Sequence, residues 1–435
     1  MAGHDVGSLT DSTTQSLCED TNGDKEFELA LRYEKGDGVE RDFTKALELY
    51  LKSSEKGNSA AMNKVGVCFE KGQGVTQDLT KAFEWFLKSA KKGNAVAMNK
   101  VGVRYEKGQG VTQDFNKAFE WYLKSAGKGN AVAMNKVGVR YEKGQGVTQD
   151  ITKSFEWFLK SANKGNAVAM NNVGLCYFNG EGVAQDFTKS FEWWLKSANN
   201  GNAEAMCMVG LCYYKGQGVT QDFTKAFEWF LKAANNGDAY AMFAVGNCYY
   251  DGQGVTKDIT KAFEWFLKSA NNGYANAMFS VGWCYYKGQG VTQDFTKAFE
   301  WHLKAANKGN VDAMFAVGNC YYDGQGVTQD ITKSFEWFLK SAENGNADAM
   351  CNVGKCYYDG QGVTQDFTKS FEWYLKAANN GCANAMFSVG LCYYDGQGVT
   401  QDFTKAYEWY LKSANNGYAN AMFSVGWCYY KGQGV

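Results

Sequence analysis

A five-residue motif, Lys-(Ala/Ser)-(Phe/Tyr)-Glu-Trp, returns every 36 residues along this chain. A fixed period of this length is typical of solenoids, in which each repeat packs against its neighbours and cannot bury its apolar face alone. Function must therefore be sought on an array of repeats. The copies begin at Lys81, Lys117, Lys153, Lys189, Lys225, Lys261, Lys297, Lys333, Lys369 and Lys405, with a weaker copy, KALEL, at Lys45.

Composition excludes several classes of function and partner. The 45 Lys and Arg residues balance 46 Asp and Glu residues, so no global basic field favours nucleic acid. No apolar run is long enough to cross a membrane, which predicts no membrane insertion. Residues 1–23 are polar and lack a targeting pattern, and we expect a disordered leader there, followed by one solenoid over residues 24–435.

The cysteines indicate a reducing environment. Nine of the 13 occupy one equivalent position in the first helix of a repeat, and the second helix offers no partner. We interpret them as small buried thiols, which predicts a cytoplasmic, intracellular location. They are Cys68, Cys176, Cys212, Cys248, Cys284, Cys320, Cys356, Cys392 and Cys428.

Each repeat predicts a helix hairpin, and the segment 58–93 illustrates it. Asn58 is placed to cap a first helix over residues 59–70, and Asp78 to cap a second helix that stops at Gly93. Gly72 and Gly74 punctuate the loop, where we expect positive φ. Ten complete repeats follow a degenerate first hairpin, and a lone final helix follows them.

Residue spacing assigns a role to each helix face. Gly66 lies in the middle of the first helix, where its recurrence predicts a close approach by a neighbouring helix. The second helix is apolar over more than half of its circumference, so it needs neighbours on both sides. Its remaining stripe, Lys81, Glu84 and Lys88, is interpreted as a solvated face with Glu84 placed to pair with Lys88.

These motifs resemble the Sel-one-like repeat family, relatives of the tetratricopeptide repeats, over residues 25–435. The resemblance implies an all-α, right-handed α/α superhelical solenoid that acts as an adaptor or scaffold for other proteins. Twelve copies of Gly-x-Gly-Val make the pattern specific. The residues that carry the resemblance in one repeat are Ala61, Met62, Val65, Gly66, Phe69, Gly72, Gly74, Val75, Asp78, Lys81, Ala82, Trp85, Lys88, Ser89, Ala90 and Gly93.

Catalytic and cofactor signals are weak throughout. Ser-x-x-Lys pairs, which open the motif set of penicillin-recognising hydrolases, begin at Ser53, Ser89, Ser125 and Ser161, but no companion motif accompanies them. The two histidines are His4 in the leader and His302, which replaces an aromatic residue of the second helix and is interpreted as a packed residue. Metal-ligand spacings and dinucleotide-binding glycines are absent. The sequence predicts no enzyme and no cofactor.

The variable positions of the first helices fall on one stripe, and the expected function is to bind a protein or peptide there. Early repeats place Glu70, Lys100 and Arg104 on this stripe, whereas later repeats place aromatic residues that are typical of interfaces. The predicted partner-binding residues are Phe243, Asn247, Tyr250, Phe279, Trp283, Tyr286, Phe315, Asn319, Tyr322, Phe387, Leu391 and Tyr394.

Other hypotheses remain open beside the scaffold. A purely structural array, or the regulatory part of a larger signalling protein, needs no ligand on the stripe. An RNA-binding repeat is disfavoured because Asp251, Asp323, Asp359 and Asp395 accompany the aromatic residues. The final helix lacks the cover of a second helix, so self-association through that end is also expected.

Overall fold

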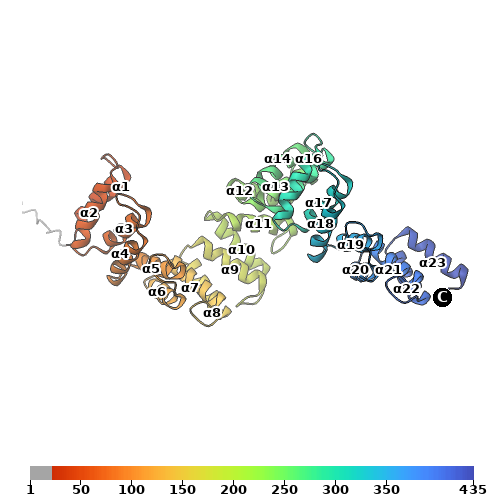
Figure 1. Ribbon diagram of the computed structural model, residues 1–435. Helices are drawn as coiled ribbons and strands as arrows, with labels where there is room; N and C mark the ends of the chain where they lie inside the picture. The colour runs from red at the N-terminus through yellow and green to blue at the C-terminus, as the bar shows by residue number, and fades with distance from the viewer. Residues whose placement is uncertain (1–21) are drawn as a thin grey trace, which may run out of the picture. The chain divides into compact units, whose positions relative to one another are not determined.

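The computed structural model describes residues 22–435, which form 23 helices and no strand. Consecutive helices pair into antiparallel hairpins, and within each of the two units described below each hairpin packs on the next (Figure 1). This arrangement confirms the all-α solenoid of helix hairpins that the sequence predicts. The leader predicted for residues 1–23, with His4, lies outside the described residues except for Asn22 and Gly23.

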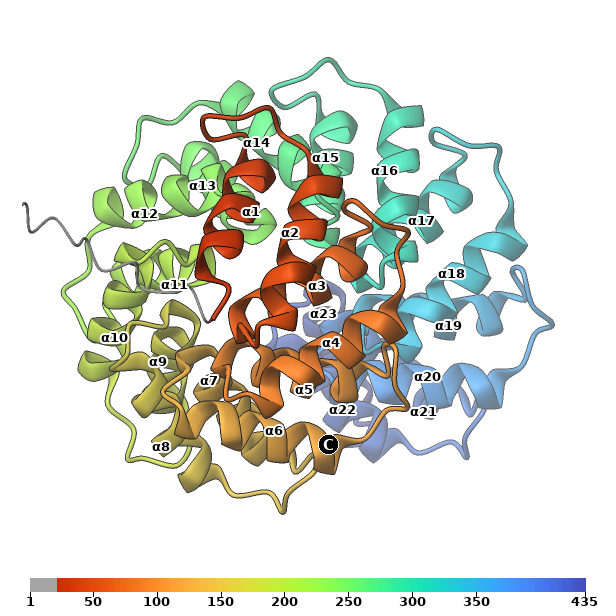
Figure 2. The same ribbon diagram turned by 90° about the vertical axis from the view of Figure 1, so that its left-hand side faces the viewer.

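The chain divides into two compact units at residue 202. The described part of the first unit contains α1 (Asp24–Lys35), α2 (Phe43–Glu55), α3 (Ser59–Lys71), α4 (Leu79–Lys91), α5 (Ala95–Lys107), α6 (Phe115–Gly127), α7 (Ala131–Lys143), α8 (Ile151–Ala162), α9 (Ala167–Asn179) and α10 (Phe187–Asn199). Within this unit, α7 and α9 lie on the inner side of the curve of hairpins, and α8 and α10 lie on the outer side (Figure 2).

The second unit repeats the same plan from residue 203 onward. Its helices are α11 (Ala203–Lys215), α12 (Phe223–Asn235), α13 (Ala239–Asp251), α14 (Ile259–Asn271), α15 (Ala275–Lys287), α16 (Phe295–Asn307), α17 (Val311–Asp323), α18 (Ile331–Glu343), α19 (Ala347–Asp359), α20 (Phe367–Asn379), α21 (Ala383–Asp395), α22 (Phe403–Asn415) and α23 (Ala419–Lys431). Odd-numbered helices are the first helices of their hairpins, and even-numbered helices are the second.

Local chemistry starts and stops the helices of the 58–93 repeat as the sequence predicts. The Asn58 side chain accepts from the backbone N–H of Ala61, and the Asp78 side chain accepts from those of Thr80 and Lys81. Gly72 and Gly74 have φ of 69° and 71°. These left-handed conformations close the hairpin loop, so that the backbone of Asp78 donates back to Phe69 at 2.9 Å.

The core runs through every hairpin at equivalent positions. Ala61, Val65 and Phe86 are fully buried, and a Cβ added to Gly66 would lie 2.5 Å from Cε1 of Phe86. The predicted close approach of two helices at the mid-helix glycine is therefore confirmed. Phe83 reaches forward and packs edge to face on Tyr105 of the next hairpin at 5.3 Å between ring centroids.

The charged stripe of the second helix is exposed, as predicted, but its pairing differs. Lys88 Nζ lies over the Trp85 ring, 4.2 Å from the centroid, and Lys81 pairs with the cap residue Asp78 at 3.6 Å. The predicted pair between Glu84 and Lys88 is therefore replaced by a cation–π contact, because the indole face lies one turn away on the same side of the helix.

Candidate functional site

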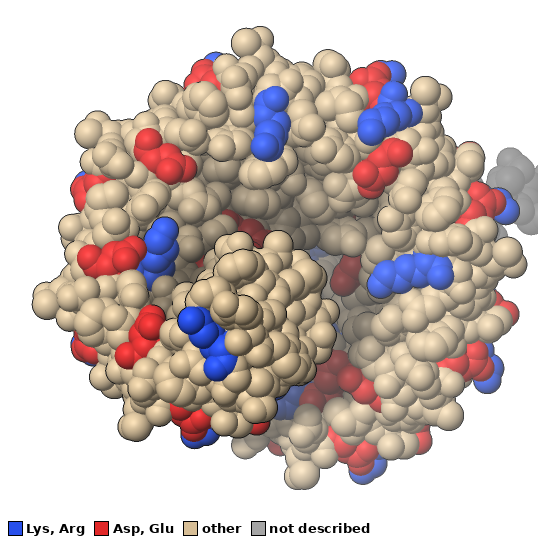
Figure 3. Space-filling model, turned by 90° about the vertical axis from the view of Figure 1, so that its right-hand side faces the viewer, with Lys and Arg blue, Asp and Glu red and all other residues tan. Residues whose placement is uncertain are grey.

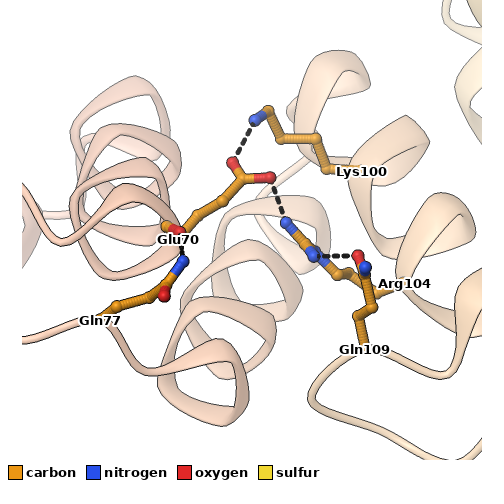
Figure 4. Close-up of polar contacts among 5 residues, drawn as sticks. All are labelled: Glu70, Gln77, Lys100, Arg104 and Gln109. Carbon is orange, nitrogen blue, oxygen red and sulfur yellow. Dashed lines mark hydrogen bonds and ion pairs between the residues drawn. The ribbon is translucent and has the colours of Figure 1, made fainter.

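In the first unit, the first-helix surface carries ion pairs that join successive repeats. Glu70 of α3 accepts from Lys100 at 3.1 Å and from Arg104, both in α5 (Figure 4). The other end of the Arg104 guanidinium donates to Oε1 of Gln109 at 2.6 Å. Glu106 and Arg140 repeat the arrangement one hairpin later, at 2.6 Å.

The arginines of this ion-pair ladder are structural. Arg104 and Arg140 are only 5% and 3% exposed, and Arg104 also lies over the Phe86 ring. A buried guanidinium needs its partners, because breaking such a pair leaves an uncompensated charge. The sequence interpretation placed Arg104 on the partner-binding stripe, which is wrong for this side chain, and its equivalent Arg140 is buried in the same way.

The ion-pair ladder ends at Glu142. At the positions equivalent to Lys100 and Arg104, the next repeat has Asn172 and Cys176. Asn172 donates to Asn135 at 3.0 Å, away from this carboxylate. Burial raises the pKa of Glu142, and the nearby carboxylate of Glu181 raises it further.

In the second unit, three of the four predicted tyrosines bridge consecutive repeats. The hydroxyl of Tyr250 donates to Oε1 of Gln289 in the following hairpin loop at 3.1 Å. Tyr394 donates to Gln433 in the same way at 3.1 Å, and Tyr322 to Gln361 at 3.5 Å. These side chains are half-buried, so part of each ring supports the scaffold.

The predicted phenylalanines pack onto the second helix of their own hairpins. Phe243, Phe279, Phe315 and Phe387 are half-buried, and each contacts the ring at the centre of that helix. The ring centroids lie 5.4 to 5.6 Å apart. The partners are Phe266, His302, Phe338 and Tyr410 respectively.

The most accessible predicted residues are Trp283 and Leu391, with 43% and 38% of their surface exposed. Trp283 continues a run of rings along one side of α15. Its ring stacks on Tyr286 with 5.5 Å between centroids and lies 6.5 Å from Phe279. This run is an exposed aromatic strip of the kind that protein interfaces use.

Cavities lie between consecutive first helices beside these rings. The first cavity, between α13 and α15, has a volume of about 320 Å³. The second, between α15 and α17, has a volume of about 480 Å³. Asn247 lines the first cavity and Asn319 the second. The first is bounded by Asn247, Tyr250, Phe266, Phe279, Ser280, Trp283, Cys284 and Gln289.

Sequence reasoning missed the residues that open these cavities. Where the ion-pair ladder has Lys100 and Arg104, the second cavity has Ala316 and Cys320. The signal was present in the sequence, since comparing repeats at a spacing of 36 shows long basic side chains replaced by short ones. Its meaning required knowing that Arg104 fills space between two repeats.

His302 of α16 is 2% exposed, which confirms that it is a packed residue. Neither ring nitrogen has a hydrogen-bond partner in residues 22–435. Burial lowers its pKa to about 4, so the imidazole is neutral at pH 7.

Eleven of the 12 described cysteines are buried, and all 12 are free thiols. The exception in burial is Cys382, which directly precedes α21 and is half-buried. A hydrogen bond from Cys351 lowers the pKa of Cys382 to about 6. The same bond, with burial, raises the pKa of Cys351.

The serines of the Ser-x-x-Lys pairs bind backbone. Ser89 is fully buried, and its hydroxyl donates to the carbonyl of Ser59 at 2.6 Å. Ser125 and Ser161 donate to the equivalent carbonyls at 2.6 Å, and Ser53 donates to Gly23 at 2.7 Å. These hydroxyls tie the second helix of a hairpin to its first helix.

Residues 22–435 contain no group of three or more His, Cys, Asp or Glu side chains arranged to hold a metal ion. No helix in this range combines the length and apolar character that crossing a bilayer requires.

Comparison with solved structures gives close matches to other helical repeat proteins. c5321, a protective antigen of uropathogenic Escherichia coli displaying an SLR fold, is 30% identical, with a TM-score of 0.72. That match covers 94% of this chain and 91% of the antigen. A Sel1 repeat protein from Oxalobacter formigenes is 26% identical over 80% of this chain and 96% of its own length, with a TM-score of 0.56.

No curated protein sequence matches this chain significantly. The Sel1 repeat model, in contrast, matches it in twelve consecutive segments. They are residues 26–58, 59–94, 95–130, 131–166, 167–202, 203–238, 239–274, 275–310, 311–346, 347–382, 383–418 and 419–435. Because these segments account for nearly the whole sequence, this chain belongs to the Sel1 repeat family.

Proposed function

We propose that this chain is a non-enzymatic protein-interaction scaffold whose first-helix surface in the second unit binds a peptide or a partner helix. Sel1 repeat proteins are in general scaffolds for protein interactions. The observation that carries the proposal is the exposed aromatic strip of α15, Phe279, Trp283 and Tyr286, which lies between two cavities. Aromatic rings contribute large apolar contact areas at low entropic cost, so such a strip suits a partner segment.

Contrast with the first unit supports this location. There, the positions equivalent to Tyr286, Ser280 and Cys284 hold Glu70, Lys100 and Arg104, which satisfy one another across repeats. In the second unit, half-exposed rings and open cavities replace those charges. The first unit is therefore better explained as a structural part of the array, and the second as the part that recognises a partner.

Affinity capture with a matched pair of variants tests the proposal. Trp283→Ser with Leu391→Ser removes the two most exposed predicted residues without opening the core. Glu300→Ser with Glu408→Ser is the control, because these exposed residues lie on the outer stripe of the same two repeats. We expect mass spectrometry to show partners lost only from the first variant, with circular dichroism unchanged in both. Equal capture by both variants would contradict the proposed surface.

For the 435-residue chain itself, we also propose self-association through α23. Phe423, Tyr429 and Tyr430 of this helix are 73%, 63% and 78% exposed, an unusually large apolar area for a free surface. On the lobe nearest the viewer in Figure 3, uncharged residues predominate, although a basic side chain lies there too. Light scattering should show a concentration-dependent dimer that Phe423→Ser with Tyr430→Ser abolishes. A strict monomer at all concentrations would exclude it.

We further propose that the protein works in a reducing intracellular compartment such as the cytoplasm. The support is that the cysteines of the repeat position are free and buried, where disulfide chemistry has no access to them. Fractionation of the source cell, with thiol alkylation before lysis, tests this. Recovery from an oxidising extracellular fraction would argue against it.

A further inference from the structure

We propose that the cavity between α15, α16 and α17 binds an arginine side chain presented by the partner. This inference rests on the proposed function and names the chemistry that the partner must carry. The cavity has a volume of about 480 Å³ and lies wholly within the second unit. It is lined by Phe279, Trp283, Tyr286, Lys287, His302, Asp312, Phe315, Ala316, Asn319, Cys320, Asp323, Gln325, Asn346 and Asp348.

The first unit shows what fills this space elsewhere in the same chain. Residues 316 and 320 are the repeat equivalents of Lys100 and Arg104. In the first unit, the Arg104 guanidinium lies over the Phe86 ring and donates to the loop residue Gln109. In the second, Ala316 and Cys320 are short, and the space that a guanidinium would occupy is part of the cavity. Gln325, the equivalent of Gln109, still lines it.

The cavity has a buried polar group without a partner. His302 lines the cavity, and only 2% of its surface is exposed. Within residues 22–435, neither of its ring nitrogens has a hydrogen-bond partner. A buried polar group without a partner is costly and calls for an explanation. Trp194 occupies the equivalent position in α10, and its indole N–H donates to the carbonyl of Asn171 at 3.2 Å. A neutral imidazole at this position offers a lone pair to a guanidinium N–H.

The charges around the cavity favour a cation. Asp312, Asp323 and Asp348 are exposed at its rim, and none pairs with a Lys or Arg within residues 22–435. Asp312 accepts a weak bond from the Asn346 amide at 3.3 Å, and Asp348 contacts the Cys382 thiol at 3.9 Å. Three carboxylates outnumber the single lysine, Lys287, so a phosphate would be repelled and a basic group attracted.

The aromatic side chains that line the cavity attract cations. Nζ of Lys287 lies 5.0 Å from the centroid of the Trp283 ring and 5.2 Å from that of Tyr286. These distances are those of cation–π contacts, so the rings already attract one positive charge. A planar guanidinium stacks on such rings better than an ammonium does, which favours arginine over lysine.

A peptide display experiment tests this inference on the full chain. A library of random dodecapeptides is selected on the wild type, and the best peptide is resynthesised with its arginine replaced by neutral, isosteric citrulline. Affinity is then measured by fluorescence anisotropy. We expect selected peptides to be rich in arginine, and the citrulline peptide to bind about tenfold more weakly, since a lost interfacial charge pair costs at least that much.

Two variants of the chain test whether the arginine side chain of the peptide binds in this cavity. Ala316→Lys with Cys320→Arg restores the residues of the first unit and fills the space. Asp312→Asn with Asp348→Asn leaves the cavity open but removes two charges, which keeps the test valid if the filled variant folds poorly. We expect each variant to weaken binding of the arginine peptide by about tenfold or more. The variant with the two asparagines should leave binding of the citrulline peptide unaffected, whereas the filled variant should weaken it too, because citrulline has the same shape as arginine.

The outcomes separate this inference from the proposed function. Selected peptides without basic residues that still need Trp283 would overturn the arginine site and leave the scaffold function standing. Arginine peptides that bind both variants as tightly as the wild type would likewise overturn the site. If no peptide is selected and the capture experiment also finds no partner, the proposed function fails together with this inference.

Discussion

His302 of α16 packs on Gly282 of α15 so closely that a Cβ at residue 282 would lie 2.3 Å from Cδ2 of the imidazole. The same contact joins Gly66 to Phe86 and Gly246 to Phe266. From α3 onward, each hairpin is thus closed at one point, where a ring of the second helix meets a glycine of the first. The glycine costs helix propensity, and the ring contact offsets that cost.

Gly246→Ala tests this contact. The new Cβ would lie 2.5 Å from Cδ1 of Phe266, so we expect a loss of about 1–3 kcal/mol from overpacking. Hydrogen exchange of α13 and α14 measures the local loss. Gly426→Ala is the matched control, because Gly426 has the same place in the repeat but no atom within 4 Å of an added Cβ. There the alanine should stabilise α23, and equal effects at both positions would refute the packing explanation.

His302 should make the second unit sensitive to mild acid. Its pKa is about 4 in the folded protein, below its ordinary value of 6.5. The unfolded chain therefore takes up the proton first, and stability is full above pH 6.5 and falls as the pH drops towards 4. The expected loss is about 3 kcal/mol of local stability. His302→Phe, which introduces the residue found in neighbouring repeats, should remove this dependence of α16 hydrogen exchange on pH.

The aspartates that cap the second helices act in a lower pH range. Backbone donors of the first helical turn hold the pKa of Asp222, Asp258 and Asp294 below the ordinary value of 3.8. Their contribution is complete above pH 3.8 and is lost as the pH falls through the lowered values. We expect the thermal midpoint to drop steeply below about pH 4. The triple Asn variant keeps the caps but cannot titrate, so its curve should be flatter in that range.

Extending the ion-pair ladder should stabilise the first unit. Asn172→Lys with Cys176→Arg reproduces Lys100 and Arg104 beside Glu142, and Glu181 takes the place of Gln109. We expect a gain of about 1 kcal/mol and a pKa of Glu142 that falls from its raised value. Denaturant unfolding and carboxyl carbon NMR measure the two effects. A raised Glu142 pKa that persists in the variant would show that the arginine does not reach the carboxylate.

Cys382 should be the most reactive of the described thiols. Its lowered pKa gives it a larger thiolate fraction than the other described cysteines, and it is less buried than they are. Iodoacetamide labelling followed by peptide mass spectrometry should modify Cys382 first. Cys351→Ala removes the hydrogen bond that lowers this pKa and should slow labelling. Faster labelling of Cys68, which is buried, would contradict the assignment.

Sequence periodicity predicts most of the fold. The caps at Asn58 and Asp78, the loop glycines and the glycine in mid-helix are all short-range signals, so one repeat suffices to interpret them. The surface was harder to predict, because Arg104 is variable between repeats and yet buried. Its burial depends on Glu70, which lies 34 residues earlier in the chain, and on the ring of Phe86. A position that varies between repeats lies outside the core of its own hairpin. The variation does not show whether its side chain is exposed to solvent or packed against the neighbouring repeat.

The loop glycines also limit how this array can change its length. A Cβ at Gly110 would lie 2.0 Å from the carbonyl oxygen of Leu79, so this loop fits against the start of the second helix one repeat earlier, as do the equivalent loops at Gly146 and Gly254. Adding or deleting a few residues within a repeat would move the following loop away from the second helix on which it packs. Whole repeats can be gained or lost, because each brings both halves of the fit, and α15 and α23 are already identical in sequence. Unequal recombination between such copies in the gene would therefore yield longer or shorter arrays that still fold.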